Sequence, residues 1–329
     1  MKSAGVLSRV AAGRSAPAVA AATSKSRSVS PWSLGLRAAL LATGSLGAAV
    51  VGISAYAAYR LTRPNRSYGE GEPPEGGYER VWFSTRDGLA LAGWFLPAAG
   101  AEHAVVLCHG FQTGKREMLP LALALRERGH HVLLFDFRGH GESDGRWTTC
   151  GLLETYDLEG AVRYLLARPD VKNVSVIGFS MGGAVAILTA ARLPEIQAVV
   201  ADSSFATLKD VIASGFRAFY RLPHIPFAPL TLWFSERLVG VKADDVRPLD
   251  AISELAPRPV FLIHGTEDKL VPLSEAFLLY ESAGEPRELW TVAGADHVGA
   301  RLIDFEGYVD RVDRFLKKQL IPAEGSARL

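Results

Sequence analysis

Cysteine is scarce in this chain of 329 residues, and its two cysteines, Cys108 and Cys150, indicate no disulfide framework. Cys108 ends an apolar run, which is typical of a small buried core residue. The sequence contains no group of cysteines and histidines with metal-ligand spacing, no phosphate-binding P-loop and no internal repeat. These residues therefore predict neither a metal site nor a nucleotide-binding domain.

A strong charge of one sign is also lacking. The chain has 36 basic and 35 acidic residues and a net charge of +1. Such a balance gives no indication of a nucleic-acid partner. The length allows one α/β domain of about 250 residues together with an extension.

Acidic residues are absent from residues 1–37, and residues of either charge are absent from 38–59. The second stretch is long enough for a bilayer, which a helix of about 20 apolar residues crosses. Two aromatic residues, Tyr56 and Tyr59, stand at its end, where a membrane interface favours them. We therefore predict a basic Ala/Ser-rich tail over 1–37, a transmembrane helix over 38–59 and a Pro/Gly-rich linker over 60–78.

Two other interpretations of this extension remain open. Ala55-Tyr56-Ala57 resembles the cleavage site of a signal peptide, and the arginine- and serine-rich, acid-poor composition fits an organellar presequence. Basic residues stand on both sides of the apolar run, and their larger number before it favours a single-pass protein with its domain outside the cytoplasm.

Alternating apolar and amphipathic segments predict one α/β domain over residues 79–322. Two runs around Asp87-Gly88 indicate a hairpin. Further strands are expected at Ala104–Cys108, Val132–Phe137, 174–179, Ile196–Ala201, Val260–Ile263 and Leu289–Val292. Helices are expected at Arg116–Arg128, Leu152–Ala167, 184–192, 274–282 and Phe305–Leu320. This alternation predicts a mostly parallel sheet with helices on both faces.

Residues 205–256 interrupt that alternation with a cluster of aromatic residues broken by prolines. The segment has two interpretations. One is a short helical lid that lines an apolar pocket, and the other is ordinary packing of helices on the sheet.

A G-x-S-x-G motif, Gly178–Gly182, lies between a β-branched apolar run and a helix rich in small residues. A strand, a sharp turn and a helix are the setting in which a nucleophilic serine stands clear of a sheet. Ser180 is therefore the candidate nucleophile. The alternative is a glycine-rich turn that carries a serine by chance.

A serine nucleophile needs a base and an acid, in the chain order Ser, acid, His. His297 follows the last expected strand and is the candidate base. Asp268 follows the strand before it and is the candidate acid. Three other carboxylates are considered for the acid: Glu267 next to Asp268, Asp296 next to His297, and Asp202 at the end of the strand after the elbow.

An oxyanion needs two backbone N–H donors. We expect them from Met181, the residue after the nucleophile, and from Phe111 in the loop after Cys108. His109 is expected to order that loop. The polar segment Asp136–Ser143 is interpreted as a loop pinned at a strand end, with His140 a weaker catalytic candidate.

Together these residues resemble the α/β-hydrolase superfamily over residues 80–320. The matching motifs are His109-Gly110-Phe111, Asp136–Ser143, Gly178–Gly183, His264–Asp268 with Val271-Pro272, and Gly294–His297. The Asp87-Gly88 hairpin, the short lid and the N-terminal anchor are similar to the serine-aminopeptidase-like, BEM46-like group of membrane-tethered hydrolases. The sequence lacks the triple glycine of hormone-sensitive-lipase-like esterases. Its serine, in place of an aspartate nucleophile, argues against epoxide hydrolase and haloalkane dehalogenase chemistry.

The resemblance implies hydrolysis of an ester, thioester or amide without a cofactor. The expected protein is a membrane-tethered serine hydrolase, carboxylesterase-like, acting on a small-molecule or lipid-like acyl substrate through an acyl-enzyme. An acyl thioesterase or a serine peptidase would use the same residues. An acyltransferase that excludes water and a non-catalytic scaffold are the remaining alternatives.

Overall fold

The computed structural model describes residues 31–64, 66–68 and 77–320. The predicted tail up to residue 30 and part of the predicted linker, at 65 and 69–76, lie outside the described residues, as do 321 and 322. The chain divides into two units, Met1–Gly47 and Ala48–Leu329.

Helix α1 (Pro31–Thr62) begins in the first unit and ends in the second. Its part from Gly35 to Thr62 has a mean hydropathy of 1.8 and is long and apolar enough to cross a membrane. The described apolar side chains of the first unit are exposed, among them Leu36, Leu40, Leu41 and Leu46. The helix extends beyond both ends of the apolar run at 38–59.

Eight strands of the second unit form one sheet in the order β1-β2-β4-β3-β5-β6-β7-β8. The strands are β1 (Glu79–Ser84), β2 (Ala90–Leu96), β3 (His103–Cys108), β4 (His131–Phe135), β5 (Asn173–Phe179), β6 (Ile196–Asp202), β7 (Val260–Gly265) and β8 (Arg287–Val292). Strand β2 runs antiparallel to β1 and β4, and the other neighbours are parallel. The predicted mostly parallel sheet is confirmed.

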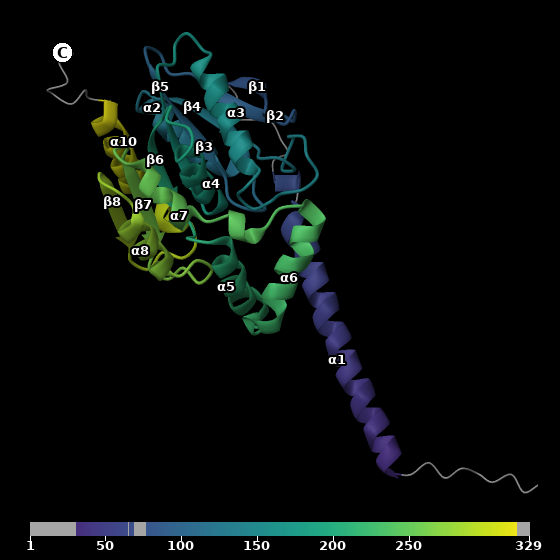
Figure 1. The fold of residues 1–329 in the computed structure, drawn as a ribbon. Coiled ribbons are helices and arrows are strands. Elements are labelled where there is room, and N and C mark those ends of the chain that lie inside the picture. Colours follow the sequence, from purple (N-terminus) through teal and green to yellow (C-terminus); the bar gives the residue numbers. More distant parts are fainter. Residues whose placement is uncertain (1–30, 65, 69–76, 321–329) are drawn as a thin grey trace, which may run out of the picture. The chain divides into compact units, whose positions relative to one another are not determined.

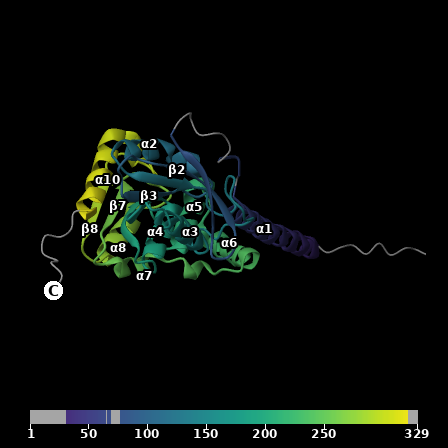
Figure 2. The ribbon, with the colours of Figure 1, turned by 90° about the horizontal axis from the view of Figure 1, so that it is seen from above.

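Helices cover both faces of this sheet, as Figure 2 shows. One face packs on α2 (Leu119–Glu127) and α10 (Phe305–Leu320), and the other on α3 (Glu154–Leu166), α4 (Met181–Ala190) and α8 (Leu273–Ser282). Successive side chains of a strand point to opposite faces, so both faces of these strands are apolar.

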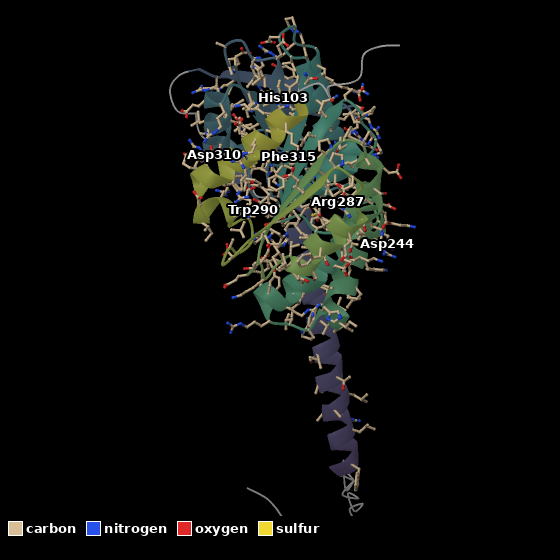
Figure 3. The ribbon with its side chains drawn as sticks, turned by 90° about the vertical axis from the view of Figure 1, so that its left-hand side faces the viewer. His103, Asp244, Arg287, Trp290, Asp310 and Phe315 are labelled. Atoms are coloured by element: carbon tan, nitrogen blue, oxygen red, sulfur yellow. The ribbon has the colours of Figure 1, made fainter. Side chains whose placement is uncertain are left out.

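Strand β3 and helix α10 illustrate this two-sided burial. Val105 and Leu107 of β3 face the α2–α10 side, and Val106 and Cys108 face the other. Phe315 of α10, labelled in Figure 3, packs on β7, where its ring lies 5.3 Å from the ring of Phe261. Each fully buried leucine or phenylalanine stabilises the fold by roughly 1.5–3 kcal/mol.

The helix expected over Arg116–Arg128 is divided in two in the structure. A 3-10 turn, η2 (Lys115–Met118), precedes α2. Pro120 stands in the first turn of α2, where its missing N–H costs no hydrogen bond. Because of Pro120, α2 begins later in the chain than the apolar periodicity predicts.

The segment between β6 and β7 is helical. It contains α5 (Leu208–Tyr220), α6 (His224–Val239), η3 (Ala243–Asp245), α7 (Pro248–Ala251) and η4 (Ile252–Leu255). The short elements η1 (Arg66–Tyr68) and α9 (Ala300–Ile303) lie elsewhere in the chain. The last turns of α1 pack on α6 (Figure 1), where the Thr231 hydroxyl donates a hydrogen bond to the Ser54 carbonyl at 3.3 Å.

Candidate active site

Ser180 occupies the turn between β5 and α4, and its backbone has a φ of 51°. A left-handed conformation at a residue other than glycine costs on the order of 1–3 kcal/mol and is most frequent at functional sites. A Cβ at Gly182 would collide with the backbone of Cys108 and His109 on the neighbouring strand end. The turn therefore requires glycine beside Ser180 and holds the serine at the carboxyl edge of the sheet.

His297 lies in the loop after β8, and its ring is next to the side chain of Ser180. The Ser180 hydroxyl donates to Nε2 of His297 across 2.9 Å. On the other side of the ring, Nδ1–H of His297 donates to Oδ2 of Asp268 at 2.7 Å. The structure thus brings the three predicted residues into one hydrogen-bonded chain.

Asp268 is held as an acceptor by its own loop. Its Oδ1 accepts the backbone N–H groups of Leu270 at 3.0 Å and Val271 at 2.8 Å. His264 lies 3.5 Å from the same carboxylate. Burial lowers the pKa of His264, and its Nε2–H donates to the Val271 carbonyl at 2.8 Å. His264 is therefore neutral, and Oδ2 of Asp268 remains directed at His297.

The other three carboxylates considered for the acid lie in different surroundings. Asp202 accepts hydrogen bonds from the Ser203 hydroxyl at 3.0 Å and the Tyr308 hydroxyl at 3.1 Å. Burial raises the pKa of Asp202 to about 6. Glu267 and Asp296 are exposed to solvent. The geometry at His297 thus favours Asp268.

The two expected oxyanion donors flank the serine. Met181 is the first residue of α4, where backbone N–H groups have no partner within the helix. Phe111 stands in the loop after β3, next to Gly110, whose position for a Cβ is 3.8 Å from the Ser180 Cβ. His109 ties this loop down, since Nδ1–H donates to the Gly110 carbonyl at 2.7 Å and Nε2 accepts the Phe137 N–H at 3.0 Å.

Sequence comparisons agree with this architecture. The sequence profile of the α/β-hydrolase fold matches residues 103–232. An uncharacterised protein of Mycobacterium tuberculosis is 33% identical over 246 residues, which cover 73% of this chain and 80% of that protein. The chain belongs to the α/β-hydrolase family.

Two further similarities narrow the group to which this α/β-hydrolase belongs. The protein bem46 of Schizosaccharomyces pombe is 26% identical over 218 residues, which cover 64% of this chain and 67% of bem46. The solved structure of the esterase Pf2001 of Pyrococcus furiosus has 33% identity and a TM-score of 0.67, and covers 79% of this chain and 98% of its own. The chain is a BEM46-like hydrolase.

The Asp136–Ser143 segment of the hydrolase is a buried polar frame beside the site. Lys115 is fully buried and its ammonium lies 2.5 Å from Asp136 and 2.6 Å from Glu142. The guanidinium of Arg138 bridges Asp87 and Asp157. His140 donates from Nδ1 to the Arg138 carbonyl at 3.0 Å, away from the serine. These bonds favour the expected structural role of the segment.

Ser203 also contributes to the site and was not identified from the sequence. The Ser203 hydroxyl accepts the backbone N–H of Val298, the residue after His297, at 3.0 Å. Ser203 and Val298 both have a φ of 55°, so two strained residues meet there. The only sequence signal for Ser203 is its place just after the strand that follows the elbow.

Proposed function

We propose that this hydrolase is a serine hydrolase that cleaves carboxylic esters through an acyl-enzyme formed on Ser180. The chain of hydrogen bonds Ser180–His297–Asp268 carries the proposal. In this chain a weak nucleophile contacts a base whose tautomer is fixed by a buried carboxylate. The similarity to the Pyrococcus esterase supports an ester as the substrate.

In the first half-reaction, Oγ of Ser180 attacks the acyl carbon while Nε2 of His297 takes its proton. The carbonyl oxygen becomes an oxyanion, which the N–H groups of Phe111 and Met181 stabilise. His297 then protonates the leaving alcohol. Asp268 stabilises the imidazolium that forms between these two proton transfers.

In the second half-reaction, a water molecule gives its proton to Nε2 of His297 and attacks the acyl carbon. Collapse of the second tetrahedral intermediate returns the proton to Ser180 and releases the acid. No cofactor takes part in this sequence. The helical segment 205–256 acts as a lid over the acyl group.

The proposed lid and the last turn of α1 meet beside the loop at residues 148–150. A cavity of about 20 Å³ lies there, lined by Leu61, Cys150, Leu208 and Leu232. That volume holds about one water molecule. We further propose that α1 tethers the enzyme to a membrane.

A fluorophosphonate probe tests the nucleophile on the full chain in mild detergent. The wild type should be labelled and Ser180→Ala should not. Ser175→Ala is the matched control, because Ser175 lies on the same strand and is buried. Absence of labelling in folded wild type, or labelling that persists in Ser180→Ala, contradicts the proposal. A series of esters, thioesters and amides then establishes the bond that is cleaved.

A further inference from the structure

The turn between α5 and α6 exposes large apolar side chains. Phe219, Tyr220 and Ile225 are 69%, 55% and 65% exposed. Isolated exposed apolar residues are ordinary, but a contiguous group on one tip marks an interaction site. We call residues 217–226 the hairpin tip.

Phe219 and Ile225 do not belong to the apolar cluster that packs the hairpin. Inside it, Phe216 stacks on Phe227 with ring centroids 5.9 Å apart, and both side chains are buried. Leu222 packs against the same cluster. The hairpin therefore has its own small core. The ring of Tyr220 lies at its edge, 5.6 Å from the ring of Phe216, and Phe219 and Ile225 are not part of the cluster.

The charges around the tip are of one sign. Residues 211–235 contain no aspartate or glutamate, and their two charged side chains, Arg217 and Arg221, are both exposed. Arginine beside exposed aromatic and aliphatic residues matches a membrane surface, which offers acyl chains and anionic phosphates together. A protein partner would need a large apolar and acidic patch to match it equally well.

The last turns of α1 lie against the hairpin within the same unit. Val50 and Ala57 pack on the cluster of Phe216 and Phe227, and Ser54 and Ala58 are fully buried. Val50 belongs to the uncharged run 38–59 and precedes Arg60 by about 15 Å of helix. A bilayer that surrounds residues 38–59 therefore also extends to the hairpin, which packs against this part of α1.

We propose that the hairpin tip inserts into the lipid bilayer beside the end of α1. Phe219 and Ile225 enter the acyl region, Tyr220 lies at the interface, and Arg217 and Arg221 bind lipid phosphates. The proposal rests on the proposed membrane tethering, and it places the lid at the surface of the lipid bilayer. It also places the proposed lid where lipid-like substrates are concentrated.

Site-directed fluorescence on the full chain in phosphatidylcholine–phosphatidylserine vesicles tests this placement. Phe219→Cys, Leu41→Cys and Leu302→Cys each receive an environment-sensitive fluorophore. Leu41 reports insertion of α1, and Leu302 is a matched control that is 73% exposed and apolar. The native Cys108 and Cys150 are buried and do not compete for the label. Fluorophosphonate labelling of Ser180 in the same samples reports the proposed activity separately.

The proposal expects nitroxide-bearing lipids to quench the fluorophore at positions 219 and 41 and to leave position 302 bright. Quenching at 41 without quenching at 219 overturns the proposal and leaves the tether intact. Quenching at neither position overturns both. Protection of position 219 from water without lipid quenching, together with energy transfer between labelled copies, assigns the tip to a second copy and also overturns it.

Discussion

Two hydrogen-bonded series of aspartate, histidine and serine lie at opposite edges of the same sheet. At the carboxyl end, Asp268, His297 and Ser180 are linked across 2.7 and 2.9 Å. At the amino end, Asp313 bonds to His130 at 2.8 Å, His130 to His103 at 2.9 Å, and His103 to Ser175 at 2.9 Å. Both serines belong to β5 or follow it directly.

The two series consist of the same residue types, but they differ in the exposure of their side chains to solvent and in the backbone conformation at the serine. The side chain of His297 is 25% exposed, and that of His130 is 2% exposed. Ser180 stands in a strained turn before the free N–H groups of α4, whereas Ser175 lies within the strand. The proposed nucleophile therefore lies beside the donors expected for an oxyanion, and Ser175 does not. The comparison indicates that the surroundings of such a series, and not its residue types, would decide whether it can react.

The largest difference is expected between the two serines. Ser180→Ala should lower ester hydrolysis by roughly 10⁴–10⁶-fold, because the nucleophile is lost. Ser175→Ala should keep the wild-type kcat, because Ser175 is remote from the oxyanion donors. Steady-state kinetics on a soluble p-nitrophenyl ester measure both. Equal losses of kcat in the two variants would contradict the proposed difference between the serines at the two edges of the sheet.

The aspartates of the two series, Asp268 and Asp313, should also differ in their effect on catalysis. Asp268→Asn should lower kcat by about 10³–10⁴-fold, because His297 loses the partner that fixes its tautomer. Asp313→Asn should leave kcat unchanged and lower the free energy of unfolding by about 1 kcal/mol, because a buried histidine exchanges a charged acceptor for a neutral one. Kinetics and urea unfolding on the same preparations separate the two effects. A kcat loss in Asp313→Asn would connect the amino end to catalysis.

The buried series should make stability depend on pH. Burial, with repulsion from His130 and His131, lowers the pKa of His103 to about 3 from an ordinary 6.5. The unfolded chain then binds a proton that the folded chain does not, so stability falls as pH decreases from 6.5 towards 3. The loss is on the order of a few kcal/mol. His103→Gln should flatten the dependence of the urea midpoint on pH between neutral and about pH 5. An unchanged slope counts against this assignment.

The smallest effect is expected at Ser203. Removing its hydroxyl in Ser203→Ala frees the Val298 N–H and loosens the loop that holds His297. A hydrogen bond of about 0.5–1.5 kcal/mol corresponds to a loss of about 2- to 10-fold in kcat. Pre-steady-state acylation rates measure this change. Ser203→Thr, which keeps the hydroxyl, should recover part of the rate.

Local sequence was sufficient for most of the fold. Strands of β-branched residues, the Asp87-Gly88 hairpin and the amphipathic closing helix follow from periodicity, because both faces of the sheet are buried. The limits of α2 did not follow, since Pro120 acts on the helix start. The end of α1 did not follow either, because its last turn is bonded to distant parts of the chain: the Thr62 carbonyl accepts the Thr148 N–H, and the Arg60 carbonyl accepts from the Gln112 amide.

The candidate site divides in the same way. The sequence by itself determined the strand–turn–helix around Ser180, since only glycine fits beside the serine, and it placed His297 and Asp268 after neighbouring strands. Tertiary structure alone decided which carboxylate meets His297. Ser180 and His297 are 117 residues apart, and four acids follow suitable strands. The order β5-β6-β7-β8 and the bonds of Leu270 and Val271 to Asp268 direct that carboxylate, while Tyr308 and Ser203 hold Asp202 elsewhere.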